Sequence, residues 1–249
     1  MEKQYKIKPL VVSKYNLRKG DMANRLFYGE TYWAPNVTWF IEGADQNILI
    51  DTSMSAEDSK KYTETKVEDL ISFEEALSSV GRKPEDIDLI IQTHLHFDHC
   101  GNTAKCKNAR VVVQKSELDF AFATHPSFRI NYDESLIKDC KIVPIQGDQE
   151  ILPGIEVIFV PGHSPGTQAV SIQTAKGKAI ISGFCACHET FFPPTPRLQW
   201  GKDWSGPVVA PGIFVDAIKA YDAVVKIKGL ADILLPMHDV AIFNMKTIP

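Results

Sequence analysis

Three histidines and one aspartate, His94, His96, Asp98 and His99, fall within six consecutive positions, and this cluster limits what the chain can be. It comes directly after residues 88–91, an apolar run that predicts a buried strand. Imidazole and carboxylate together suit Zn, Fe, Mn or Co. Histidines two apart can project to the same side of a strand end, whereas the next two ligand residues begin a new turn. The spacing therefore predicts two adjacent metal positions.

The alternative is a histidine cluster that decorates a solvated loop. That reading explains a single histidine well, but it explains poorly why four ligand-type side chains gather beside one buried strand.

The composition of the 249 residues is that of an ordinary globular protein. A formal charge of −4, without a basic block, gives no support to a nucleic-acid or membrane partner. The chain starts without the apolar segment of a signal peptide, and no run is long enough to span a bilayer, so we expect a cytoplasmic protein. Five irregularly spaced cysteines indicate reduced thiols. With no linker or repeat, we predict a single domain over residues 1–249.

Apolar runs and turn signals predict strands that alternate with helices. Residues 14–35 predict a long loop, and residues 37–51 predict a hairpin. Apolar residues at near-helical spacing predict helices over 67–80 and 213–227. A proline within residues 142–145 places that strand at a sheet edge.

Further candidate site residues follow other predicted strands. His163 comes after the strand 155–160, in a turn rich in glycine and proline, and His238 comes after the strand 232–236. Residues 182–185 form another exit from a strand. Sheet proteins place ligands at such exits. A lone histidine there is more often packed or solvated, but two of them added to the first cluster favour a shared site.

These residues resemble the metallo-β-lactamase superfamily. The resemblance rests on His94, His96, Asp98, His99, His163 and His238, in that order. Within the superfamily the sequence is most similar to N-acyl-homoserine lactonases and similar small lactonases, in residues 47–52, 161–168, 211–213 and 227–236. The resemblance implies an α/β fold, an αββα four-layer sandwich with two sheets face to face and helices outside.

The resemblance also implies how the ligands divide between two ions. The first ion would be held by His94, His96 and His163, and the second by Asp98, His99 and His238. We expect two zinc ions, with Fe, Mn or Co as alternatives.

One position departs from the family pattern. A bridging aspartate normally follows a Ser-Gly or Thr-Gly pair, whereas this chain reads Ser182-Gly183-Phe184-Cys185. A Cys185 thiolate could ligate zinc or iron and bridge two ions. The alternative is that Cys185 is a small buried residue, with water or substrate alone bridging the ions or with a single ion bound.

Similar lactonases carry a tyrosine a few residues beyond that aspartate, where it hydrogen-bonds the substrate. If Cys185 takes the aspartate's place, His188 falls at the tyrosine's position. His188 could then stabilise the oxyanion or protonate the leaving group, because an ordinary histidine titrates near working pH. The alternative is an ordinary surface histidine.

The implied chemistry is hydrolysis of an ester-like bond, a lactone above all, by a metal-bound hydroxide. Asp98 could orient the attacking water in addition to ligating. The expected partner is a small-molecule substrate, and a homodimer is left open. Either the apolar part of the pocket or the core is expected to contain the aromatic residues Tyr28, Tyr32, Trp33, Phe191, Phe192, Trp200 and Trp204.

Three other functions share these motifs. A thioester hydrolase of the glyoxalase II type would need a helical extension for which the residues after His238 leave no room. An iron-dependent oxidoreductase is less compatible, because flavodiiron proteins carry glutamate at the position of His96 and persulfide dioxygenases use the aspartate that is missing here. A member that binds ligands without catalysis is the third alternative.

Overall fold

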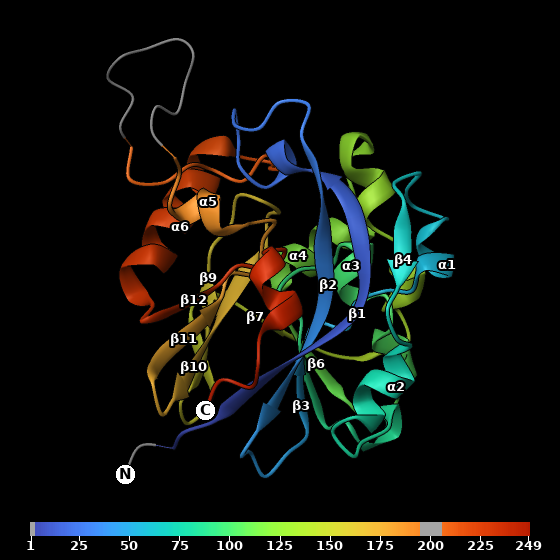
Figure 1. Cartoon of the computed structure of the whole chain (residues 1–249). Helices are drawn as coiled ribbons and strands as arrows, with labels where there is room; N and C mark the ends of the chain where they lie inside the picture. Colours follow the sequence, from blue (N-terminus) through green and yellow to red (C-terminus); the bar gives the residue numbers. More distant parts are fainter. Residues whose placement is uncertain (1–2, 195–205) are drawn as a thin grey trace.

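The computed structural model describes residues 3–194 and 206–249. Within these residues the strands form two sheets, one of seven strands and one of five. The sheets face each other, and helices cover their outer sides, with α2 on one side and α5 and α6 on the other (Figure 1). The predicted αββα sandwich is therefore confirmed.

The larger sheet contains, in spatial order, β4 (Val67–Asp69), β1 (Lys6–Arg18), β2 (Thr31–Glu42), β3 (Ile48–Ile50), β5 (Leu89–Ile91), β6 (Arg110–Gln114) and β7 (Lys141–Ile145). The pairs from β4 to β3 are antiparallel, and the pairs from β3 to β7 are parallel. The strand β7 lies at the edge, as its proline predicts.

The smaller sheet contains β12 (Ile233–Leu235), β11 (Gly177–Ile181), β10 (Gln168–Thr174), β9 (Ile155–Phe159) and β8 (Gln149–Leu152). Its strand β12 runs parallel to β11, and its other pairs are antiparallel.

The α-helices are α1 (Ala56–Ser59), α2 (Phe73–Ser78), α3 (Phe97–Cys100), α4 (Lys115–Phe122), α5 (His188–Phe191) and α6 (Ala217–Leu230). The 3-10 turns are η1 (Lys19–Asp21), η2 (Pro84–Asp86), η3 (Thr103–Lys105), η4 (Pro126–Asn131), η5 (Glu134–Leu136) and η6 (Val240–Asn244). Among the described residues, no helix combines the length and the apolar character that crossing a bilayer requires.

Alternating side chains of the central strands fill two separate apolar layers. Ile48 and Ile50 of β3 point into the core between the sheets, whereas Leu49 packs against α2 with Phe73 and Leu77. A strand that is buried on both faces reads as a continuous apolar run, as β3 does. Each such buried side chain contributes roughly 1.5 to 3 kcal/mol to folding, so the two layers hold the strand ends in place.

The predicted helix over residues 67–80 is wrong in its first half. Its beginning is the edge strand β4, and α2 begins only after Ser72. The Ser72 hydroxyl accepts a hydrogen bond from the Glu75 N–H, and the Glu75 carboxylate accepts one from the Ser72 N–H. This capping box sets the start of the helix. In the same way, Asp216 caps α6, so that helix begins at 217 rather than 213.

The predicted loop over residues 14–35 is shorter in the structure. The strand β1 continues to Arg18 and β2 begins at Thr31, and these ends pair with each other. Between Lys14 and Arg18, at the end of β1, polar and apolar residues do not alternate clearly enough for the sequence pattern to predict a strand there.

Candidate metal centre

The candidate ligands lie in loops that follow three strands. The first cluster follows β5, with Asp98 and His99 inside the short helix α3. His163 follows β9, and His238 follows β12. The two sheets therefore bring together ligands that are far apart in the sequence.

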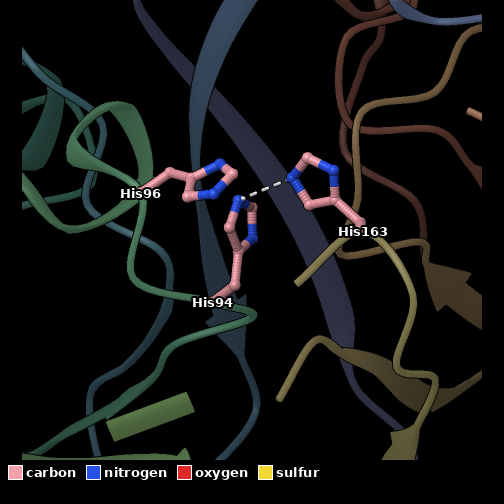
Figure 2. A group of neighbouring side chains, drawn as sticks. All are labelled: His94, His96 and His163. Atoms are coloured by element: carbon pink, nitrogen blue, oxygen red, sulfur yellow. Dashed lines mark hydrogen bonds between the residues drawn. The ribbon is translucent and has the colours of Figure 1, made fainter. Parts of the chain in front are cut away.

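Among the described residues, the structure forms two groups of three candidate ligands whose nitrogen or oxygen atoms lie within 4.8 Å of one another. Group one is His94, His96 and His163, and group two is Asp98, His99 and His238. Figure 2 shows the three rings of group one converging, one from each side and one from below. The grouping is the one that the family resemblance implies.

Group one presents free ring nitrogens to a shared point. The Nε2 atoms of His94 and His163 lie 3.2 Å apart, and the Nε2 of His96 is buried without a hydrogen-bond partner among the described residues. Burial lowers the pKa of His94 and His96 well below the usual value, and that of His163 to about 4. The rings are therefore neutral at pH 7, which a metal ligand requires.

Backbone carbonyls orient two of the rings from behind. Nδ1 of His163 lies 2.8 Å from the carbonyl oxygen of Ile213, and Nδ1 of His238 lies 3.1 Å from that of Pro35. A neutral imidazole has one N–H, so donation from Nδ1 leaves the Nε2 lone pair free. Such contacts fix both the tautomer and the direction of a ligating histidine.

A buried carboxylate orients the ring of His99. Asp51 Oδ2 lies 2.7 Å from Nδ1 of His99 and also accepts from the Thr93 hydroxyl, while Oδ1 accepts from the Thr93 N–H. Burial lowers the pKa of His99, but Asp98 and Asp51 outweigh burial and raise it above its usual value. Asp51 therefore ties group two to the segment that leads into group one.

Asp98 is the most accessible of the candidate ligands. Its side chain is 21% exposed, against 4% for His99, and its Oδ2 lies 3.5 Å from the His99 Nε2. The Asn36 amide donates to the Asp98 carbonyl and holds that backbone. Burial lowers the pKa of His238, the third member. A carboxylate on the open side of group two is placed to meet water.

The donor sets fit divalent ions. Group one offers three neutral imidazoles, and group two offers two imidazoles and a carboxylate. Zinc sites that keep an open position for water or substrate use such sets of three protein ligands.

Cys185 lies behind group one, outside both groups. Its Sγ is 3.4 Å from Nδ1 of His163 and 3.3 Å from the carbonyl oxygen of Asp21. The nitrogen that it meets faces away from His94. Burial raises the pKa of the Cys185 thiol, which disfavours the thiolate. Ligation by Cys185 stays a prediction from the sequence, and this geometry favours the alternative of a small buried group.

We therefore expect Cys185→Ala to keep the wild-type metal content, because the thiol contacts the ring edge opposite the ligand atoms. Elemental analysis of the purified variants measures this, with Cys185→Asp beside it and Cys140→Ala as a control for the loss of a thiol elsewhere. Loss of an ion in Cys185→Ala alone would put the thiol back into the ligand set.

His188 is exposed at the start of α5. Its ring stacks on Phe192 at 4.9 Å and lines a pocket of about 450 Å³ together with residues of α6, β12 and η6. None of the six candidate ligands lines this pocket. The predicted role of His188 in turnover stays a prediction, tested by whether His188→Ala lowers turnover more than it lowers metal content.

The aromatic residues of the two long segments have different surroundings. Tyr32 is next to the site, since its hydroxyl donates to the His238 carbonyl oxygen. Phe191 is part of the core, and Tyr28 is 80% exposed. Lysine ammonium groups lie over the Trp33 ring. Trp200 and Trp204 lie outside the described residues.

Sequence reasoning missed Asp51 and Glu117, which touch the ligand loops without being candidate ligands. Asp51 carried a signal, because it directly follows a buried strand, and the histidine cluster likewise begins within three residues of one. Glu117 carried none, since an acidic residue in the first turn of a helix is common for reasons of helix polarity alone.

Asp51→Asn is expected to lower kcat/KM about 10-fold to 100-fold, because an amide cannot accept all the hydrogen bonds that hold His99 and Thr93. Steady-state kinetics and metal analysis measure the effect. Asp45→Asn is the matched control, since the Asp45 carboxylate is 96% exposed. Wild-type kinetics in Asp51→Asn would show that the carboxylate does not orient the site.

Comparison with known sequences shows which family the chain matches. A family model described as the metallo-beta-lactamase superfamily matches residues 31–183. An N-acyl homoserine lactonase of Bacillus cereus is 38% identical over 111 residues, which are 42% of this chain and 40% of that protein. Another, from Bacillus sp, is 32% identical over 170 residues, 61% of this chain and 64% of that protein. In these matches the chain spans less than two thirds of either relative.

Solved structures have a similar fold over nearly the whole of this chain. A quorum-quenching N-acyl homoserine lactone lactonase has a TM-score of 0.77 at 24% identity, over 97% of this chain and 95% of that one. An N-acyl homoserine lactone hydrolase with N-hexanoyl-L-homoserine bound at its catalytic metal center has a TM-score of 0.76 at 23% identity, over 98% and 96%. At these identities the likeness shows the fold.

Proposed function

Because this chain belongs to the metallo-beta-lactamase superfamily, we propose that it is a metal-dependent hydrolase that opens an ester-like bond, and that the bond is that of a lactone. The observation that carries the proposal is the pair of ligand groups that converge at the strand ends. The lactone is supported by the curated relatives, which are N-acyl homoserine lactonases.

Groups one and two would each hold one divalent ion, zinc in the first place, because neutral imidazoles and a carboxylate suit it. Ions held there would supply a Lewis acid for the substrate carbonyl and lower the pKa of a water molecule toward about 7. The chain itself then needs no nucleophile. Burial keeps the three rings of group one neutral, hydrogen bonds from behind fix the direction of His163, His99 and His238, and Asp98 presents a carboxylate to water.

Asp98 would have a second task beside ligation. Its carboxylate is more accessible than the ring of His99, and it can accept a hydrogen bond from the attacking water and so orient it. The Tyr32 hydroxyl donates to the His238 carbonyl oxygen and so helps to hold the backbone of the third ligand of group two.

The test is hydrolysis by purified, metal-loaded protein of a panel of N-acyl homoserine lactones and of thioesters. We expect the ring-opened acid as the product and faster cleavage of lactones than of thioesters. Faster thioester cleavage would favour a hydrolase of the glyoxalase II type. Oxygen uptake, measured beside it, would favour an oxidoreductase, and failure with every ester and thioester would favour a ligand-binding protein. The metal-depleted protein is the control.

A further inference from the structure

One buried carboxylate outside the ligand groups accepts hydrogen bonds from both loops that build group one. Glu117, in the first turn of α4, is fully buried. Its Oε1 accepts from the Leu95 N–H and the Tyr132 hydroxyl, each at 2.9 Å. Its Oε2 accepts from the Ser164 hydroxyl at 2.5 Å and the Gly166 N–H at 3.0 Å. Both oxygens therefore have two donors each.

The positions of these donors decide what the carboxylate does. Leu95 lies between His94 and His96, and Ser164 directly follows His163. One oxygen of Glu117 thus holds the loop after β5, and the other holds the loop after β9.

We propose that Glu117 is a positioning residue that sets the loop of His94 and His96 at a fixed distance from the loop of His163. It joins the two halves of group one, which lie on loops of different sheets.

Two further contacts support this role. The Tyr132 ring, whose hydroxyl bonds Glu117, meets the His96 ring edge to face at 4.9 Å. Gly166 approaches α4 so closely that a Cβ atom there would lie 2.2 Å from the Glu117 nitrogen. The loop of His163 is therefore seated against the start of α4, and a larger residue at 166 would displace it.

The chemistry of the carboxylate explains why glutamate stands here. An ionised carboxylate accepts on both oxygens, whereas an amide accepts on one and donates on the other. In Glu117→Gln one of the two loops would therefore face an N–H₂ group where its backbone N–H now finds an acceptor. An unpaired buried N–H destabilises the arrangement that contains it.

Group two has a different anchor, and this makes the proposal specific. Asp51 holds His99, whereas Glu117 bonds no residue of group two in the described part of the chain. Loss of Glu117 should therefore weaken one ion and spare the other. We infer this on the premise of the proposed metal site, independently of the lactone as substrate.

The experiment measures zinc affinity by competition with a chelator in backgrounds that keep one group intact. In His238→Ala, which disables group two, adding Glu117→Gln should raise the Kd of the remaining ion about 10-fold to 100-fold, the effect typical of supporting residues around a metal. In His163→Ala, which disables group one, adding Glu117→Gln should leave Kd unchanged. Adding Glu117→Gln should change the absorption of bound Co²⁺ in the His238→Ala protein and leave it unchanged in the His163→Ala protein.

Gly229→Ala is the control for a substitution in a helix, because a Cβ there meets open space. If Glu117→Gln does not fold, Ser164→Ala and Tyr132→Phe each remove one donor and should raise Kd in the same background by less. The positioning role would be overturned if Glu117→Gln left the Kd unchanged in the His238→Ala background. It would also be overturned if Glu117→Gln raised the Kd equally in both backgrounds. Zinc-loaded wild-type protein that hydrolyses no lactone would overturn the proposed function alone.

Discussion

His94→Ala is expected to lower kcat/KM for lactone hydrolysis about a thousandfold, because the ring is central to the proposed site. Its centroid lies 4.5 Å from that of His96, 4.0 Å from that of His99 and 4.7 Å from that of His163. Metal-ion assistance supplies several kcal/mol of transition-state stabilisation, and each 1.36 kcal/mol is about a tenfold change in rate. Steady-state kinetics with metal analysis of the same sample measures the loss.

His125→Ala is the matched control, since His125 is exposed at the start of η4 and is distant in sequence from the ligand loops. Its kcat/KM should equal that of the wild type. A folded His94→Ala protein with undiminished turnover would remove the ligand groups from the mechanism.

Metal removal is expected to abolish lactone hydrolysis and to lower the melting temperature. An ion that binds only the folded chain adds about 2.7 kcal/mol of stability at a free concentration of about 100 times Kd. In a chain of this size, about 1 kcal/mol shifts Tm by roughly 2 to 4 °C. Each tightly held ion should therefore contribute about 5 to 10 °C, measured by thermal unfolding before and after dialysis against a chelator.

Added zinc should restore both activity and Tm. The control is the double variant His94→Ala with His238→Ala, whose Tm should not respond to the chelator because each group has lost a ligand. A wild-type Tm that is insensitive to chelation, in protein shown to have lost its metal, would contradict the proposed site.

The sequence predicted the site best where a metal-binding side chain comes soon after the end of an apolar strand. His94, His163 and His238 each follow an apolar run that ends abruptly, so both the strand and the functional loop after it could be predicted. The division into two ligand groups came from the family resemblance, because residue spacing cannot say which distant loop meets which part of the cluster.

The remaining features depend on contacts that one sequence does not encode visibly. Glu117 matters because two loops from different sheets pass its carboxylate, and no local pattern reports that approach. The position of Cys185 predicts a substitute ligand, and the sequence could not show that its thiol lies 3.4 Å from Nδ1 of His163. The helix predicted over 67–80 is shorter in the structure, because Val67 and the two residues after it pair with β1 as an edge strand.

The order of the ligands along the chain also sets an order of assembly during synthesis. Four of them, from His94 to His99, emerge from the ribosome together, yet neither group is complete with them. Group one is completed only by His163, and group two only by His238, near the last strand. On the proposed metal site, group two gains its last ligand only when the chain has passed β12, so an ion in group two would mark a chain whose smaller sheet has its final strand.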